Sequence, residues 1–192
     1  MYDTFVRLGG WLFKYRTSLP LPIAAALLLI PAQDLPPAVF LIGAALVAWG
    51  ERLRLESVRH IGAISRTRSD RLGPLVSSGP FAWVRNPLYL GNIMLWVGFA
   101  LSAGLAWLAP VIAALLFAAY HAVVLWEEQL LAARLGDAYR EYAARVPRWI
   151  PRPAPSSSPR PAFSWREALF SERGTLMAIA GGYLLLYLKL KT

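Results

Sequence analysis

The sequence contains no cysteine and only two histidines, His60 and His121. The absence of cysteine excludes disulfides, thiol nucleophiles and thiolate metal sites. Two imidazoles do not complete the ligand set that zinc usually takes, and no carboxylates stand at a spacing that would complete it. We therefore expect no metal centre.

Charged residues are also scarce, at 16% of the 192 residues, whereas hydrophobic residues make up 57%. This balance is too apolar for an ordinary water-soluble domain. The apolar residues fall in separate runs, at roughly 18–32, 38–55, 88–103, 106–126 and 174–190. Because a helix crosses a bilayer with about 20 residues, we predict an all-α polytopic membrane protein. It should have about five transmembrane helices and short amphipathic helices on the cytoplasmic side.

The net charge of +9 could indicate nucleic-acid binding, but the positions of the basic residues favour a membrane. Lysine and arginine gather before the first apolar run, between the second and third, and after the fourth, while the turns at 33–37 and 102–106 contain neither. This asymmetry follows the positive-inside rule. We expect an integral protein of a bacterial inner membrane, with a cytoplasmic N-terminus and an external C-terminus. Its partners should be the bilayer and a membrane lipid or lipidated acceptor, and no nucleic acid.

The chain divides into three parts. Residues 1–151 are expected to form one membrane domain, whose motifs lie within 75–151. Residues 152–173 are predicted to be a Pro- and Ser-rich linker followed by a short interfacial helix, and residues 174–192 an additional transmembrane helix.

Several boundaries can be predicted from single residues. The second apolar run continues as a helix until Gly62, and a polar cytoplasmic loop with turn signals should follow at 65–78. Gly136 should end the helix that contains the fourth run, and Asp137 should cap the next helix. Tyr139, Tyr142 and Val146 recur on one face of that helix.

The third and fourth apolar runs are joined by a short turn, so they should form an antiparallel hairpin whose outer ends meet at one side of the membrane. The start of one helix then lies beside the end of the other, and two polar clusters form one pocket. The residues brought together are Arg85, Asn86, Tyr89, Asn92, Glu127 and Glu128.

Burial of a carboxylate near membrane depth costs free energy unless a cation pairs with it. Glu127 and Glu128 point about 100° apart on a helix, so at most one faces the pocket squarely, and the other can pair with Arg85 or Arg134. His121 lies six and seven residues before them, on nearly the same face. Equally simple alternatives are that the glutamates mark the water interface and that His121 is a hydrogen-bonded strut.

Tyrosines and an amide offer further ligand contacts. Tyr89 and Asn92 lie one turn apart, and the rings of Tyr139 and Tyr142 could cap the pocket. The alternative is that these tyrosines belong to the aromatic belt at the membrane interface.

Two sequence blocks resemble the isoprenylcysteine carboxyl methyltransferase and phospholipid methyltransferase family. The first runs from Gly79-Pro80-Phe81 through Val84-Arg85-Asn86-Pro87-Leu88-Tyr89-Leu90-Gly91; the second comprises Glu127-Glu128-Gln129-Leu130, Gly136, Tyr139, Tyr142 and Val146-Pro147-Arg148-Trp149-Ile150-Pro151. The resemblance covers roughly 75–151 and implies an all-helical membrane methyltransferase that uses S-adenosylmethionine.

The resemblance implies that Arg85, Asn86, Tyr89 and Gly91 line the cofactor and reaction site, and that Glu127 or Glu128 holds the cofactor's ammonium group. Together with the residue-based reasoning, it gives two sets of expected site residues. The catalytic set is Arg85, Asn86 and His121; the cofactor-binding set is Tyr89, Gly91, Asn92, Glu127, Glu128, Tyr139 and Tyr142.

The chain departs from the family pattern in two ways. Asn86 stands where many members have histidine, and a fifth apolar run extends the chain. The expected function is methyl transfer to a membrane-embedded lipid or lipid-like acceptor, an isoprenoid or a phospholipid. An amine or hydroxyl acceptor would need a base, for which His121 or the freer glutamate is the candidate.

Two alternatives stay open. An NADPH-dependent membrane reductase is the first, because sterol reductases share the Arg-x-Pro-x-Tyr-x-Gly region, although the glutamate pair favours methyl transfer. A non-catalytic lipid-binding membrane protein is the second.

Overall fold

A computed structural model describes residues 2–16, 18–62, 75–152 and 161–191 of the chain. These residues form α-helices and two short 3-10 helices, and no strand occurs among them. The all-α prediction is therefore confirmed. The loop predicted at 65–78 and the linker within 152–173 lie largely outside the described residues.

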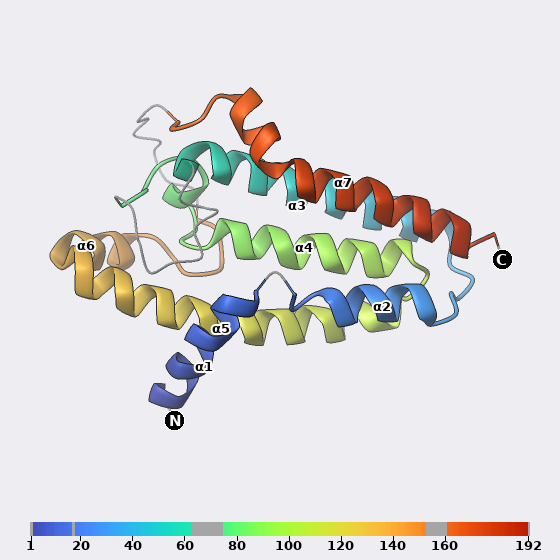
Figure 1. Cartoon of the computed structure of the whole chain (residues 1–192), viewed down its shortest axis with the longest axis horizontal. Coiled ribbons are helices and arrows are strands. Elements are labelled where there is room, and N and C mark those ends of the chain that lie inside the picture. The colour runs from blue at the N-terminus through green and yellow to red at the C-terminus, as the bar shows by residue number, and fades with distance from the viewer. Residues whose placement is uncertain (1, 17, 63–74, 153–160, 192) are drawn as a thin grey trace.

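Long helices run side by side along the molecule (Figure 1). Helix α4 (Pro87–Ser102) packs against both α3 (Pro37–Ile61) and α5 (Ala109–Leu135), and α7 (Trp165–Lys189) packs against α3. Shorter elements complete the chain. They are α1 (Tyr2–Tyr15), which packs against α5, α2 (Leu21–Leu29), η2 (Gly79–Ala82), η3 (Ala106–Leu108) and α6 (Asp137–Arg145).

Proline and glycine set most helix boundaries. Proline occupies the first turn of α3, α4 and α5, where its missing N–H would have no helical partner. Gly62 and Gly136 end α3 and α5 with φ of 68° and 57°, as predicted. Asp137 does not cap α6, because Gly136 already stands before that helix; Asp137 lies in its first turn and pairs with Arg140.

Glycines also bring α3 and α4 into close contact. A Cβ atom added to Gly91 would lie 2.8 Å from the carbonyl oxygen of Gly50, and one added to Gly98 would lie 2.6 Å from that of Gly43. Neither position can accept a side chain without moving the neighbouring backbone. This approach, typical of helix pairs with small residues, places the polar end of α3 directly beside the start of α4.

The predicted spans are only partly reproduced. The run at 18–32 is not one helix, because the chain turns at 18–20 between α1 and the nine-residue α2, which ends at Leu29. The short interfacial helix and the last span are instead one continuous helix, α7. Within the described residues, one helical stretch, Ala106–Leu135, is long and apolar enough to cross a membrane, and Pro87–Ser102 is apolar but shorter. The number of crossings stays a prediction.

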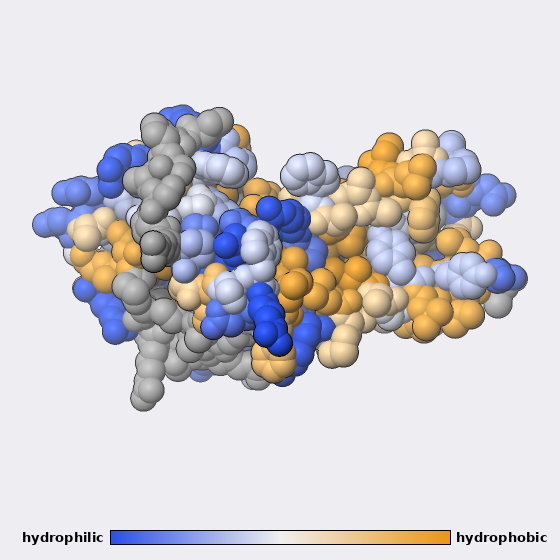
Figure 2. All heavy atoms as spheres, turned by 90° about the horizontal axis from the view of Figure 1, so that it is seen from above, coloured by the Kyte–Doolittle hydropathy of each residue, from blue (hydrophilic) through white to orange (hydrophobic). Residues whose placement is uncertain are grey.

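The outer surface carries many large hydrophobic side chains. Examples on three different helices are Leu29, Trp49 and Met177, with exposed fractions of 81%, 68% and 66%. In Figure 2, hydrophobic residues gather on the half of the molecule away from α6, and hydrophilic residues dominate the other end. An apolar surface of this extent is typical of membrane association.

Candidate functional site

A cavity of about 970 Å³ lies among the helices. This volume is at the upper end of the usual range for small-molecule sites, about 300–1,000 Å³. One part of the wall, which we call the polar wall, carries charged and phenolic side chains from α3 to α7. Another part carries apolar side chains from α2, α4 and α7. The cavity is therefore amphipathic, with room for a polar and an apolar group.

Glu127 lies in the polar wall beside two tyrosines of the hairpin. The Tyr89 hydroxyl donates to Glu127 Oε2 at 2.9 Å, and the Tyr89 ring packs on the Tyr120 ring with 4.9 Å between centroids. Tyr120 and Glu127 are seven residues apart and so share one face of α5. The predicted meeting of the start of α4 with the end of α5 is confirmed.

Glu128 faces two arginines. Arg148 Nε and Nη2 contact both oxygens of its carboxylate, the shortest distance being 2.7 Å, and Arg85 Nη1 lies 3.1 Å from Oε1. Asn86 Nδ2 donates to the carbonyl oxygen of Arg148 at 3.1 Å and so holds this segment in place. The predicted pairing of one glutamate with Arg85 is confirmed. Glu128 is thus neutralised within the protein, whereas Glu127 receives a hydrogen bond from a neutral phenol.

Tyr139 and Tyr142 of α6 lie at the same end of the cavity, as their shared face predicted. The Tyr142 hydroxyl donates to the carbonyl oxygen of Phe81 at 2.8 Å, which joins α6 to η2. Burial, with a smaller contribution from the Glu128 carboxylate, raises the pKa of Tyr139 to about 12. Burial also raises the pKa of Tyr142. Both phenols are therefore neutral hydrogen-bonding groups at physiological pH.

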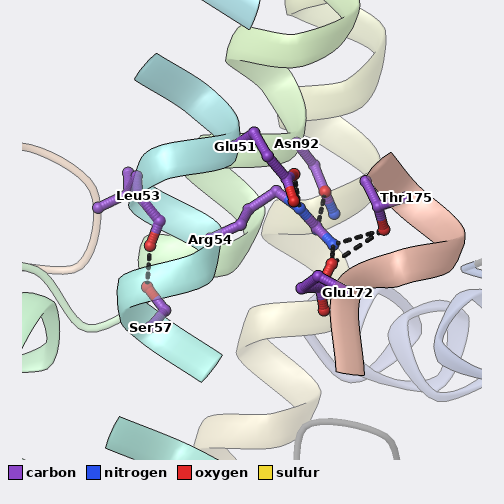
Figure 3. Close-up of polar contacts among 7 residues, drawn as sticks. All are labelled: Glu51, Leu53, Arg54, Ser57, Asn92, Glu172 and Thr175. Atoms are coloured by element: carbon purple, nitrogen blue, oxygen red, sulfur yellow. Dashed lines mark hydrogen bonds and ion pairs between the residues drawn. The ribbon is translucent and has the colours of Figure 1, made fainter. Parts of the chain in front are cut away.

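A second polar cluster joins three helices on the cavity wall (Figure 3). Arg54 of α3 donates from Nε to Glu51 Oε2 at 3.1 Å, from Nη1 to Asn92 of α4, and from Nη2 to Glu172 Oε2 of α7 at 2.5 Å. Thr175 bonds to both Arg54 and Glu172. Glu51 and Glu172 are only 5% and 2% exposed. This buried network fixes α7 against the hairpin.

Two predicted site residues do not line the cavity. Trp149 Nε1 donates to His121 Nδ1 at 3.1 Å, and the His121 ring stacks on Phe117 with 5.7 Å between centroids, so the His121 side chain packs against these two aromatic rings. Gly91 packs against α3, where an added Cβ would lie 2.7 Å from Arg54 Cγ. On this face of α5 the cavity is lined by Tyr120 and not by His121. A catalytic role of His121 stays a prediction.

Comparison with known sequences agrees with this geometry. The sequence profile described as phospholipid methyltransferase matches residues 38–138, more than half of the chain. The chain belongs to the phospholipid methyltransferase family. The matched region contains α3, α4 and α5, and thus Arg54, Arg85, Tyr89 and both glutamates of the cavity wall. Most of α6 and all of α7 lie beyond it.

Two related proteins of this family are named as metal-resistance proteins. The chain is 40% identical over 80 residues to the cobalt-zinc-cadmium resistance protein CzcN of Cupriavidus metallidurans, and 33% identical over 78 residues to the nickel-cobalt-cadmium resistance protein NccN of Alcaligenes xylosoxydans xylosoxydans. Each match covers 41% of this chain and 36% of the relative. No solved structure shows a significant match.

The sequence reasoning missed several cavity residues. Tyr120, which is 1% exposed, lines the cavity where we expected its neighbour His121. Arg54, Glu172 and Thr175 were also missed, because Arg54 and Glu172 are 118 positions apart. One signal was available: Glu51 and Arg54 are charged residues at the end of an apolar run, where a charge needs a partner.

Proposed function

We propose that this chain transfers a methyl group from S-adenosylmethionine to a lipid or lipid-like acceptor in the membrane. The observation that carries the proposal is the amphipathic cavity, which joins a carboxylate and tyrosines to apolar walls in a member of a phospholipid methyltransferase family. When bound, S-adenosylmethionine supplies an activated methyl group on a sulfonium. Methyl transfer from this cofactor to a lipid requires a polar wall, which binds the cofactor, beside an apolar compartment, which binds the lipid.

The residues of the polar wall fit a cationic cofactor. Glu127 is a partly buried carboxylate that lines the cavity and accepts a hydrogen bond from Tyr89. The guanidinium of Arg16, which also lines the cavity, stabilises its charge from a distance, without an ion pair within 4 Å among the described residues. A buried carboxylate in this state favours a cationic ligand. We therefore assign the ammonium of the cofactor to Glu127. Glu128, held by Arg85 and Arg148, has the different role of fixing the wall.

The other groups of the polar wall position the reactants and exclude water. Tyr139 and Tyr142 supply neutral hydroxyls and aromatic surface, and Asn86 holds the segment that contains Arg148. Methyl transfer from a sulfonium disperses charge, so alignment in a dry cavity contributes most of the catalysis. Of the candidate bases for an amine or hydroxyl acceptor, Glu127 lines the cavity and His121 does not, but Glu127 cannot act as the base while it holds the ammonium of the cofactor.

We also propose that the molecule spans a bacterial inner membrane, with the polar end of the cavity in the cytoplasm. The basic side chains Arg85 and Arg148 lie at that end, and the turns without basic residues meet at the other end, where Gln33 N donates to the carbonyl oxygen of Gly104 at 3.0 Å. The C-terminus would then be external, because Lys189 Nζ contacts the carbonyl oxygen of Leu27 at 2.7 Å.

The metal-resistance names belong to proteins of which the match covers 36%, a share too small to extend that role to this chain.

Isothermal titration of the purified chain in detergent with S-adenosylmethionine and with NADPH tests the proposal. We expect saturable binding of S-adenosylmethionine and none of NADPH. Glu127 offers a carboxylate to the ammonium of S-adenosylmethionine, whereas Arg54 and Arg85, which could bind the phosphates of NADPH, are already paired with glutamates. Binding of NADPH alone would contradict the proposal in favour of a reductase. Binding of neither compound would favour a non-catalytic lipid-binding protein.

A further inference from the structure

Helix α7 lies beyond the family match, yet it forms a wall of the cavity. Its first half is fastened to α3 by the Arg54–Glu172 pair and by the Trp165 ring, which lies under the guanidinium of Arg59 at 4.1 Å. Glu172 is 2% exposed, so this attachment is part of the core of the molecule. The cavity therefore includes an element that the family profile does not cover.

The other half of α7 is fastened as well. The Tyr183 hydroxyl lies 3.2 Å from Ser102 Oγ of α4, and Lys189 Nζ donates to the carbonyl oxygen of Leu27 at 2.7 Å. Gly182 packs closely on α4, since an added Cβ would lie 3.1 Å from the Phe99 ring. With both halves attached, the distance between α7 and α4 is fixed.

Between these attachments α7 turns small residues toward the cavity. Gly174, Ala178 and Gly181 recur at i, i+4 and i+7, share one helix face and line the cavity. A Cβ added to Gly174 or to Gly181 would meet nothing within 4 Å, in contrast to one added to Gly182. The space in front of Gly181 is thus open cavity rather than packed protein.

The surroundings of this space are apolar. Leu21, Ala24 and Leu28 of α2 and Trp96 and Phe99 of α4 form the facing walls, and Leu185 continues the α7 wall. These wall residues are all uncharged, and hydrocarbon placed against them would lose its contact with water. The same cavity continues to Tyr89 and Glu127, so a molecule with an apolar chain and a polar head can occupy it lengthwise.

We propose that α7 forms one wall of a channel for the hydrocarbon chain of a membrane phospholipid, and that Gly181 sets the width of this channel. As far as that lipid is the methyl acceptor, the inference rests on the proposed function. Lipid occupancy itself requires no methyl transfer, and it can be measured separately.

Native mass spectrometry of the full chain in detergent, titrated with dioleoyl phosphatidylethanolamine, measures the occupancy. The variants are Gly181→Leu, which fills the channel, and Gly181→Ala, whose methyl group has free space and leaves folding intact. Ala180→Leu is the matched control, because Ala180 is exposed and does not line the cavity. We expect wild type and Ala180→Leu to retain one lipid, Gly181→Ala to bind more weakly, and Gly181→Leu to bind at least about tenfold more weakly.

Equal retention by all four proteins would overturn the inference, and so would equal loss in Gly181→Leu and Ala180→Leu, which indicates annular lipid only. Titration of the same proteins with S-adenosylmethionine separates the two proposals. If lipid retention follows the expected order and no protein binds S-adenosylmethionine, the channel stands and the methyltransferase proposal fails.

Discussion

Glu127 and Glu128 are sequence neighbours with different surroundings. Glu128 is held by two guanidinium groups, whereas Glu127 accepts a hydrogen bond from Tyr89 and faces the cavity. The cause is the helical rotation of about 100° between neighbours, which turns one side chain toward the segment of Arg148 and the other toward α4. The Glu128 carboxylate is thereby paired with two arginines of the protein, whereas the Glu127 carboxylate faces the cavity, where a cationic ligand can bind it.

Substitution of each glutamate should therefore have a different effect. We expect Glu127→Gln to weaken S-adenosylmethionine binding by about 2–5 kcal/mol, because it removes the charge partner of a buried cation. Glu128→Gln should mainly lower thermal stability, since Arg85 and Arg148 lose their partner. Isothermal titration and thermal unfolding in detergent measure the two effects.

Glu141→Gln is the control for both measurements, because Glu141 is exposed on α6. It should change neither quantity. Unchanged cofactor affinity in Glu127→Gln, in a protein that binds S-adenosylmethionine as wild type, would contradict the assignment of the ammonium to Glu127.

Much of the polar wall could be predicted from the sequence, and the orientation of one residue could not. The short turn between the third and fourth apolar runs predicted that Tyr89 and Arg85 would meet the glutamate pair, as they do. We also expected His121 in the pocket, but the cavity face of α5 carries Tyr120 one position earlier. In a helix that is apolar all round, the hydrophobic pattern does not fix the rotation about the helix axis.

The helices have two distinct ends. The ends of α3 and α5 and the start of α4 carry the polar wall, and the connections α2–α3 and α4–α5 meet at the other end through Gln33 and Gly104. Helix boundaries at Gly62 and Gly136 could be predicted because glycine at positive φ ends a helix. The break between α1 and α2 could not, since prolines near a helix start are compatible with a continuous span.

The two ends should lie on opposite sides of the membrane. The chain has no cysteine, so Asp34→Cys and Gln129→Cys, both at exposed positions, introduce a single thiol at each end. In cells with a permeabilised outer membrane, an impermeant maleimide should label Asp34→Cys and not Gln129→Cys. After lysis both should react, which controls for accessibility. Labelling of Gln129→Cys before lysis would contradict a cytoplasmic polar end.

At the scale of the whole molecule, a family core is completed by a helix from outside the family match. Residues 38–138 contain the hairpin and α3, while Glu172 and Thr175 of α7 close the polar network of Arg54. The sequence predicted a fifth apolar run but not its attachment, because contacts between such distant residues leave no local pattern. The result is one cavity whose polar and apolar parts come from all parts of the chain.

Methyl transfer to lipid tests the central claim most directly. The purified chain, reconstituted with a bacterial total lipid extract, is incubated with S-adenosylmethionine that carries a radiolabelled methyl group, and the organic phase is counted after extraction. We expect label in the lipid fraction for wild type and Glu141→Gln, and a fall to background for Glu127→Gln. A wild-type protein that binds S-adenosylmethionine but leaves the lipid fraction unlabelled would contradict the account.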